Sequence, residues 1–183
     1  MKIAVILNNI RSNENVGSIF RTADAAGVDK IYLCGYTPAP VDRFSRVNKA
    51  LAKASLGAEK FVEWEKAKNL KSLISNLKTE KFKIIGVEQS PKSKNYKLLS
   101  TNANLAFVFG NEVKGLSKKD LSLCDQIVEI PMRGRKESLN VAVVAGIILV
   151  VLLVWTLYWK GRAMWTSARS SEKIWFVAFL LVN

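Results

Sequence analysis

The chain has 183 residues and a formal net charge of +13, from 28 Lys and Arg against 15 Asp and Glu, yet 49% of its residues are hydrophobic. This apolar content excludes a disordered chain, and two cysteines cannot form a disulfide framework. Because the chain has no histidine, a four-ligand Cys/His zinc site and Ser-His-Asp or Cys-His catalysis are excluded.

Charge and apolarity are concentrated in different parts of the chain. Residues 1–140 carry 24 Lys and Arg and 14 Asp and Glu, whereas residues 141–183 carry 4 and 1. The run from Val141 to Trp159 has 19 residues without a charge. A basic pI of about 9.9 favours nucleic acid or an anionic membrane surface as a partner, although lysines that only keep a small domain soluble would produce the same balance.

Strand and helix patterns alternate along the chain. In chain order they predict a strand at 3–7, a helix at 15–26, a strand at 30–34, a basic helix at 46–55, a short strand at 59–63, an amphipathic helix at 65–77, a strand at 82–87, a polar loop at 90–95, a strand at 105–109, a helix at 118–123, a strand at 126–130 and a long apolar helix from about residue 139. This order predicts an α/β domain with a mostly parallel sheet and helices on both faces. The first apolar run is too short for a signal peptide, so we expect a cytoplasmic protein.

Three polar segments follow predicted strands, at Asn8–Gly17, Gly110–Gly115 and Met132–Asn140. Ligands of open parallel sheets bind beyond the carboxyl ends of the strands, so each segment is a candidate site. Residues 110–117 nearly match a phosphate-binding P-loop. Leu116 stands where that motif needs lysine, and this excludes a nucleotide triphosphatase.

Individual residues in these segments have both local and functional interpretations. Asn15 is expected to cap the helix that follows, and Arg21 is either a surface arginine or a functional one. Glu112 either belongs to an ordinary turn or pairs with an arginine or a polar ligand. Ser138 is a good helix cap, and Asn140 lies early in an apolar helix, where its side chain must find a partner.

Together the three segments carry a resemblance to a known family. The stretches NENVGSIFRTADAAG, FVFGNEVKGLS and IPMRGRKESLNVAVVAGI, in this order, resemble the motifs of the SpoU (TrmH-like) branch of the SPOUT RNA methyltransferases. The stretches KIYLCGYTPAP and KASLGAEK are also typical of that branch. The resemblance covers about residues 2–150, and the order and spacing of the three motifs make it specific.

The resemblance implies a fold and a cofactor. The C-terminal part of the α/β domain would form a deep trefoil knot, which periodicity alone never predicts. The knot would hold S-adenosylmethionine against the loops after the last two predicted strands. The positions that match the family's cofactor contacts are Gly110, Ile130, Leu139 and Met132, with Glu88 as a weaker candidate.

The resemblance also implies an enzymatic role, an RNA 2′-O-ribose methyltransferase acting on tRNA or rRNA. Arg21 would engage the ribose 2′-hydroxyl, while Asn15, Glu112, Ser138 and Asn140 match the other polar active-site positions. Glu112 would hold the guanidinium of Arg21 in place. The alternative is a catalytically silent RNA-binding protein of the same fold.

The basic surface would then contact RNA phosphates. The candidates are Arg43, Arg46, Lys53, Arg133, Arg135 and Lys136. Members of this family usually act as homodimers, with the knot region at the interface, so a homodimer is expected.

The C-terminal extension departs from the family. The methyltransferase domain is expected to cover residues 1–150, leaving 151–183 as an atypical hydrophobic extension. Three interpretations remain open: packing on the domain or dimer, membrane association, and an altered reading frame without a selected function. The run 141–159 is long and apolar enough for a membrane span, and aromatic residues followed by Lys160 and Arg162 suit a membrane boundary.

Overall fold

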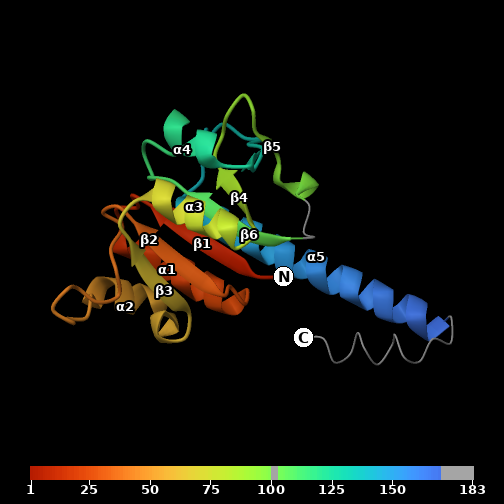
Figure 1. Ribbon diagram of the computed structural model, residues 1–183, viewed down its shortest axis with the longest axis horizontal. Coiled ribbons are helices and arrows are strands. Elements are labelled where there is room, and N and C mark those ends of the chain that lie inside the picture. Colours follow the sequence, from red (N-terminus) through yellow and green to blue (C-terminus); the bar gives the residue numbers. More distant parts are fainter. Residues whose placement is uncertain (100–102, 170–183) are drawn as a thin grey trace.

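The fold is a parallel sheet between two layers of helices. The computed structural model describes residues 1–99 and 103–169 (Figure 1). The sheet has seven strands in the order β3-β2-β1-β6-β4-β7-β5, and every strand pair is parallel. Its strands are β1 (Ile3–Asn8), β2 (Lys30–Cys34), β3 (Glu63–Ala67), β4 (Phe82–Val87), β5 (Lys94–Asn95), β6 (Asn104–Phe109) and β7 (Gln126–Glu129). The predicted α/β class with a mostly parallel sheet is therefore confirmed.

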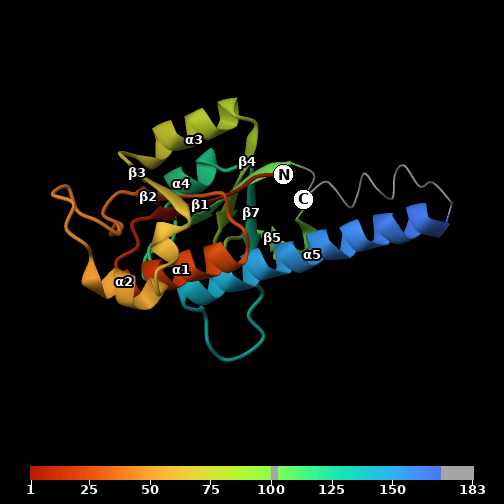
Figure 2. The same ribbon diagram turned by 90° about the horizontal axis from the view of Figure 1, so that it is seen from below.

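Helices cover both faces of this sheet (Figure 2). The α-helices are α1 (Asn13–Ala25), α2 (Lys49–Ser55), α3 (Leu70–Thr79), α4 (Lys118–Leu123) and α5 (Val141–Arg169), with short 3-10 helices at Ala58–Lys60 and Tyr96–Leu98. The sets of packed side chains place α1, α2 and α5 on one face and α3 and α4 on the other. Both faces of the central strands are thereby buried, which explains their unbroken apolar runs.

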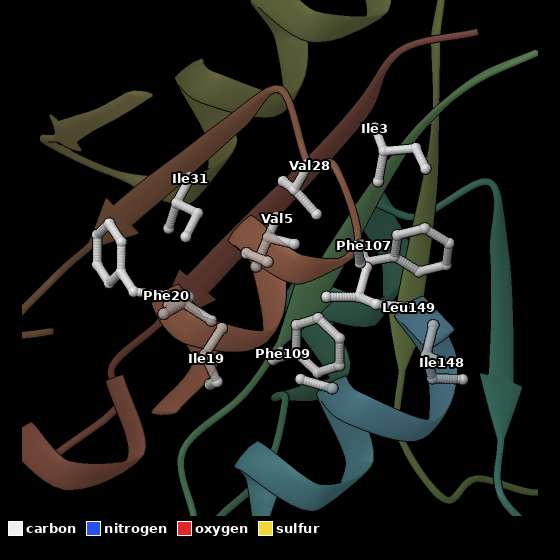
Figure 3. Packing of buried hydrophobic residues seen from close by; sticks show 14 of the residues in the cluster. Ile3, Val5, Ile19, Phe20, Val28, Ile31, Phe107, Phe109, Ile148 and Leu149 are labelled. Atoms are coloured by element: carbon white, nitrogen blue, oxygen red, sulfur yellow. The ribbon is translucent and has the colours of Figure 1, made fainter. Parts of the chain in front are cut away.

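The larger core lies between the sheet and the layer of α1 and α5. Figure 3 shows Phe107 and Phe109 of β6 near Ile148 and Leu149 of α5, with Phe20 of α1 on the other side of the cluster. All five side chains are at most 2% exposed. The first turns of α5 are thus an integral part of the domain core.

The structure corrects two elements around residue 60. The predicted strand at 59–63 is a 3-10 helix followed by the start of β3, and the predicted helix at 65–77 begins only at Leu70. β3 is a polar edge strand, so it lacks the apolar alternation of a typical strand. Pairing with β2 and ion pairs from Lys30 to Glu63 (2.7 Å) and Glu65 (3.1 Å) stabilise it instead.

Two further boundaries also differ from the prediction. The basic helix starts at Lys49 instead of Arg46, because the carboxylate of Asp42 accepts hydrogen bonds from the backbone N–H groups of Phe44 and Arg46 and holds a turn there. The side chain of Asn48 then caps α2. The predicted loop at 90–95 ends in the short strand β5.

One close contact between α1 and α2 gives a test of this packing. A Cβ atom added at Gly17 would lie 2.6 Å from both the Ala54 Cβ and the Leu51 backbone oxygen. Overpacking of this kind costs about 1–3 kcal/mol, and the better helix propensity of alanine offsets about 1 kcal/mol. We expect Gly17→Ala to lower the free energy of unfolding by up to about 2 kcal/mol in urea denaturation. At Gly134 an added Cβ meets nothing within 4 Å, so Gly134→Ala serves as the control.

Candidate active site

The three motif segments meet through one chain of side-chain hydrogen bonds. The amide of Asn15 in α1 donates to the Glu112 carboxylate at 3.0 Å, and the amide of Asn140 donates to the Asn15 side-chain oxygen at 2.9 Å. Glu112 follows β6, and Asn140 directly precedes α5. Asn15 is thereby joined to two residues that follow it by 97 and 125 positions in the sequence. We call this polar group the Glu112 cluster: Asn15, Glu112 and Asn140.

Helix capping positions this cluster, but not through the residues that the sequence favours. Ser12, not Asn15, caps α1, because its hydroxyl accepts the backbone N–H of Asn15 at 3.0 Å. This frees the Asn15 side chain to bridge Glu112 and Asn140. Likewise, α5 starts after Asn140, whose side chain accepts the backbone N–H of Ala142 at 2.8 Å. The capping roles predicted for Asn15 and Ser138 are therefore wrong, whereas the expected partner for Asn140 is found.

Glu112 anchors the N-terminus of α1. Its carboxylate accepts the backbone N–H groups of Arg11 (3.0 and 3.1 Å) and Ser12 (3.0 Å) in addition to the Asn15 amide. Partial burial raises the pKa of Glu112, but these hydrogen bonds outweigh burial and hold the pKa below its ordinary value. Glu112 is therefore an ionised anchor for α1 at neutral pH.

Arg21 does not pair with Glu112. It lies on the exposed side of α1, about two turns beyond the Glu112 cluster, and none of the ion pairs among the described residues includes it. The predicted Glu112–Arg21 contact is corrected, because the carboxylate is engaged by backbone N–H groups and by the Asn15 amide. The guanidinium of Arg21 instead faces solvent, where a large anionic ligand can reach it.

A cavity of about 130 Å³ lies beside the Glu112 cluster. It collects five predicted site residues from the carboxyl ends of β4 and β7 and from the segment before α5. The full lining is Val87, Glu88, Gln89, Glu129, Ile130, Met132, Ser138, Leu139 and Val144. The structure thus brings together Glu88, Ile130, Met132, Ser138 and Leu139 in one place, and Asn140 follows directly in the chain.

Glu88 and the loop after β6 hold each other in place. The Glu88 carboxylate accepts the backbone N–H of Leu116 at 2.7 Å. A Cβ added at Gly115 would lie 2.2 Å from the same carboxylate, and one added at Gly110 would lie 2.5 Å from the Gly115 and Leu116 backbone. Gly110 does not line the cavity. Close backbone packing therefore explains both glycines, and the cofactor contact of Gly110 stays a prediction.

A second, wider groove carries basic and aromatic side chains. It lies on the segment between β2 and α2, with a volume of about 1040 Å³, and its lining includes Tyr36, Arg43, Arg46 and Trp64. The guanidinium carbons of Arg43 and Arg46 lie 4.8 and 5.1 Å from the ring centre of Phe44, which is 62% exposed. Phe44 was not among the residues predicted to contact RNA, although an aromatic residue between Arg43 and Arg46 is a signal that the sequence contains.

The other basic candidates are separate from this groove. Lys53 is exposed on α2, and Arg133, Arg135 and Lys136 are exposed on the loop between β7 and α5. Figure 2 shows this loop projecting from the helical layer formed by α1 and α5. These cations therefore lie on two separate elements, α2 and the loop between β7 and α5.

Neither cysteine is a candidate nucleophile. Burial raises the pKa of the thiols of Cys34 and Cys124 to about 11, so both stay protonated at neutral pH. Among the described residues there is also no group of three or more acidic or cysteine side chains that could hold a metal ion. The polar chemistry of the site therefore rests on arginine, amide, hydroxyl and carboxylate groups.

Comparison with known proteins identifies the family of this site. The family model described as the SpoU rRNA Methylase family matches residues 2–150, which contain the Glu112 cluster, the cavity and Arg21. The chain belongs to the SpoU rRNA methylase family. Residues 135–183 also match a family of unknown function, so the C-terminal extension of this SpoU-family chain has a resemblance of its own.

Relatives and solved structures agree with this assignment. A TrmH family tRNA/rRNA methyltransferase of Staphylococcus aureus is 34% identical over 149 residues, which are 81% of this chain and 57% of that protein. The AdoMet-bound rRNA methyltransferase of Sinorhizobium meliloti is similar with a TM-score of 0.72 and 29% identity, covering 81% of this chain and 54% of that one. The TrmH/SpoU tRNA modifying enzyme of A. aeolicus has a TM-score of 0.71 and 30% identity, covering 81% and 72%. The chain thus spans little more than half the length of its curated relatives.

The anchoring role of Glu112 predicts a pH-dependent stability. Because its pKa is lowered on folding, Glu112 contributes stability above the ordinary carboxyl pKa of about 4.3, and this contribution is lost as the pH falls through the lowered value. We expect Glu112→Gln to destabilise the protein more at about pH 7 than at about pH 3, in urea unfolding. Asn140→Ala changes no titrating group and should cost the same at both values. An equal cost of Glu112→Gln at both pH values would contradict the anchoring role.

Proposed function

We propose that this chain is an S-adenosylmethionine-dependent RNA methyltransferase that methylates a ribose 2′-hydroxyl of tRNA or rRNA. The observation that carries the proposal is the meeting of all three family motifs in the Glu112 cluster, directly beside the cavity that holds the predicted cofactor residues. The family assignment and the exposed side chain of Arg21 on α1, about two turns beyond the Glu112 cluster, support it.

The cavity fits one part of the cofactor. Ligand pockets commonly measure about 300–1,000 Å³, so a cavity of about 130 Å³ suits an adenine-sized group. Val87, Ile130, Met132 and Leu139 supply apolar walls for such a ring. The remainder of the cofactor would extend toward the Glu112 cluster. When bound, S-adenosylmethionine supplies an activated methyl group whose departure leaves a neutral thioether.

The residues of the chain would position the reacting ribose. Arg21 would orient the 2′-hydroxyl and stabilise the negative charge that develops on its oxygen during in-line attack on the methyl carbon. The guanidinium of arginine stays protonated in proteins and therefore cannot accept a proton. The hydroxyl proton would pass to a nearby phosphate or to water instead. Ser138, Asn15 and Asn140 would hold the loops at the distance that the transfer requires, and Glu112 would keep α1 in register with them.

A deep trefoil knot in the C-terminal part is also proposed. β7 lies between β4 and β5 in the sheet, although β4 and β5 are consecutive in the chain. The connection at residues 88–93 must therefore cross β7. The side chain of Gln89 in this connection donates to the backbone oxygen of Glu137 at 2.9 Å, which brings it against the segment after β7. A knotted chain requires a crossing of this kind, in which one connection passes over a strand that comes later in the sequence.

We propose a homodimer through the outward side of the first turns of α5. Val143 and Val150 are 49% and 46% exposed, whereas Ala145, Ile148 and Leu149 of the same helix are buried in the core. A second copy packed on this exposed stripe would remove it from water. Because Arg21 and the first turns of α5 belong to the same helical layer, the partner would lie near the site.

The enzymatic proposal is tested at Arg21. We expect Arg21→Ala to reduce methyl transfer from labelled S-adenosylmethionine to RNA by about 100-fold or more, as loss of one charge-stabilising group does elsewhere. Cofactor binding in calorimetry should be unchanged, since Arg21 lies outside the cavity lining. Lys71→Ala, an exposed cation on α3 across the sheet, is the control and should retain activity.

Two outcomes would overturn parts of this proposal. Full methyl transfer by Arg21→Ala with unchanged RNA binding would remove Arg21 from the mechanism. RNA binding by the native chain without any cofactor binding would favour the catalytically silent RNA-binding protein instead. Mass mapping of ribose methylation in cells with and without the gene would identify the modified nucleotide.

The exposed ring of Phe44, which lies against the groove-lining residues Arg43 and Arg46, indicates how RNA is held. A base stacked on an aromatic ring contributes about 1–3 kcal/mol, so we expect Phe44→Ala to weaken RNA binding by about 5- to 150-fold, measured by fluorescence anisotropy. Phe61→Ala, which removes an aromatic ring that is 79% exposed elsewhere on the surface, is the matched control. Loss of RNA affinity in both variants, or in neither, would contradict a specific stacking site at Phe44.

A further inference from the structure

The second half of α5 leaves the domain. Leu152 is the last residue of α5 in the hydrophobic core, yet the helix continues to Arg169. Figures 1 and 2 both show this part of α5 projecting well beyond the sheet and the other helices. The 17 residues from Leu153 to Arg169 correspond to about 25 Å of helix. A helix that projects this far receives little stabilisation from the domain.

The projecting part of α5 carries large apolar side chains that no described residue buries. The exposed fractions are Val154 59%, Trp155 45%, Leu157 59%, Tyr158 54%, Trp159 46% and Trp165 67%. At about 100° per residue these positions fall on one side of the helix, in an arc of about 200°, and Lys160 lies on the opposite side. A single partner helix covers a narrower stripe, whereas a membrane interface covers one whole side of a helix. The distribution therefore favours a lipid surface over a second protein chain.

The packing of α5 excludes a membrane span over its first half. Residues Val141–Thr166 are long and apolar enough to cross a membrane by length and composition. However, Ala145, Ile148, Leu149 and Leu152 are at most 5% exposed in the domain core and cannot also face lipid. The described part of α5 beyond Leu152 has Lys160 and Arg162 near its middle, and cations are costly at the centre of a bilayer. The projecting helix is thus suited to the interface and not to the centre of a bilayer.

Aromatic rings and cations occur together in this segment. The ring centres of Trp155 and Tyr158 each lie 5.5 Å from that of Trp159, and the Arg162 guanidinium carbon lies 5.4 Å from the Trp159 ring. Trp and Tyr rings prefer the level of the lipid headgroups, and Lys and Arg extend their charged ends to lipid phosphates. The combination matches the chemistry of an anionic membrane surface.

We propose that residues 153–169 bind the surface of membranes containing anionic phospholipid. Trp155, Tyr158 and Trp159 lie at the boundary between headgroups and acyl chains, and Lys160 and Arg162 contact lipid phosphates. The excess of cations over acids in the chain adds a longer-range attraction to the same surface. Binding would hold the domain of residues 1–150 close to the membrane, and it does not depend on methyltransferase activity.

The test is flotation of the full chain with lipid vesicles. We expect the native protein to float with vesicles of phosphatidylcholine and phosphatidylglycerol and to stay unbound with phosphatidylcholine alone. Trp155→Ser/Tyr158→Ser/Trp159→Ser should abolish flotation, whereas Phe61→Ser, a change at an exposed ring outside α5, should not. Because each cation near an anionic surface contributes on the order of 1 kcal/mol, Lys160→Gln/Arg162→Gln should weaken binding roughly tenfold or more. Thermal unfolding of each variant would establish that the domain is intact.

Depth measurements separate interfacial binding from the alternatives. Quenching of tryptophan fluorescence by lipids brominated near the headgroup, and weak quenching by deep bromines, is the expected result. Strong deep quenching together with resistance to alkaline carbonate would show a spanning segment and overturn the proposal. Failure to bind either vesicle would also overturn it. In that case, a soluble oligomer that dissociates in the triple variant would identify a second copy as the occupant of this surface.

Discussion

The Glu112 carboxylate is the interaction on which the arrangement of the site depends. It accepts two backbone N–H groups before α1 and the side-chain amide of Asn15, which in turn accepts the amide of Asn140. One charged group after β6 thereby sets the start of α1 and the entry to α5. Charged acceptors form stronger hydrogen bonds than neutral ones, so a carboxylate suits this task better than an amide. The cavity beside the cluster depends on the same loops.

The two halves of helix α5 have different environments. Its first turns fill the core against Phe107 and Phe109, and they also supply the end of the segment that lines the cavity. Its second half leaves the domain with exposed aromatic rings and cations. The apolar run that follows the charged part of the chain is therefore one helix with a buried first half and a projecting second half, and not a separate domain. Residues 170–183, which include the second apolar run at 174–182, lie outside the described residues.

Local sequence signals predicted the buried elements better than the polar ones. β1 and β4 were predicted nearly to the residue, because unbroken apolar runs define them without help from the rest of the chain. β3 was misplaced because its stability comes from β2 and from Lys30, which no local pattern contains. Asn15 and Ser12 are equally good caps by residue type, and only the position of Glu112 decides between them.

By itself, the sequence determined the α/β class, the three motifs and the family to which they belong, because apolar periodicity and residue type are local properties. It also identified most residues of the cavity. Only the tertiary structure decided which polar groups meet: Glu112 with the N-terminus of α1 instead of Arg21, and Asn140 with Asn15. It alone decided that α5 contributes to the core as far as Leu152 and projects from the domain beyond it. Such pairings depend on where parallel strands end in space, and sequence separation carries no information on that distance.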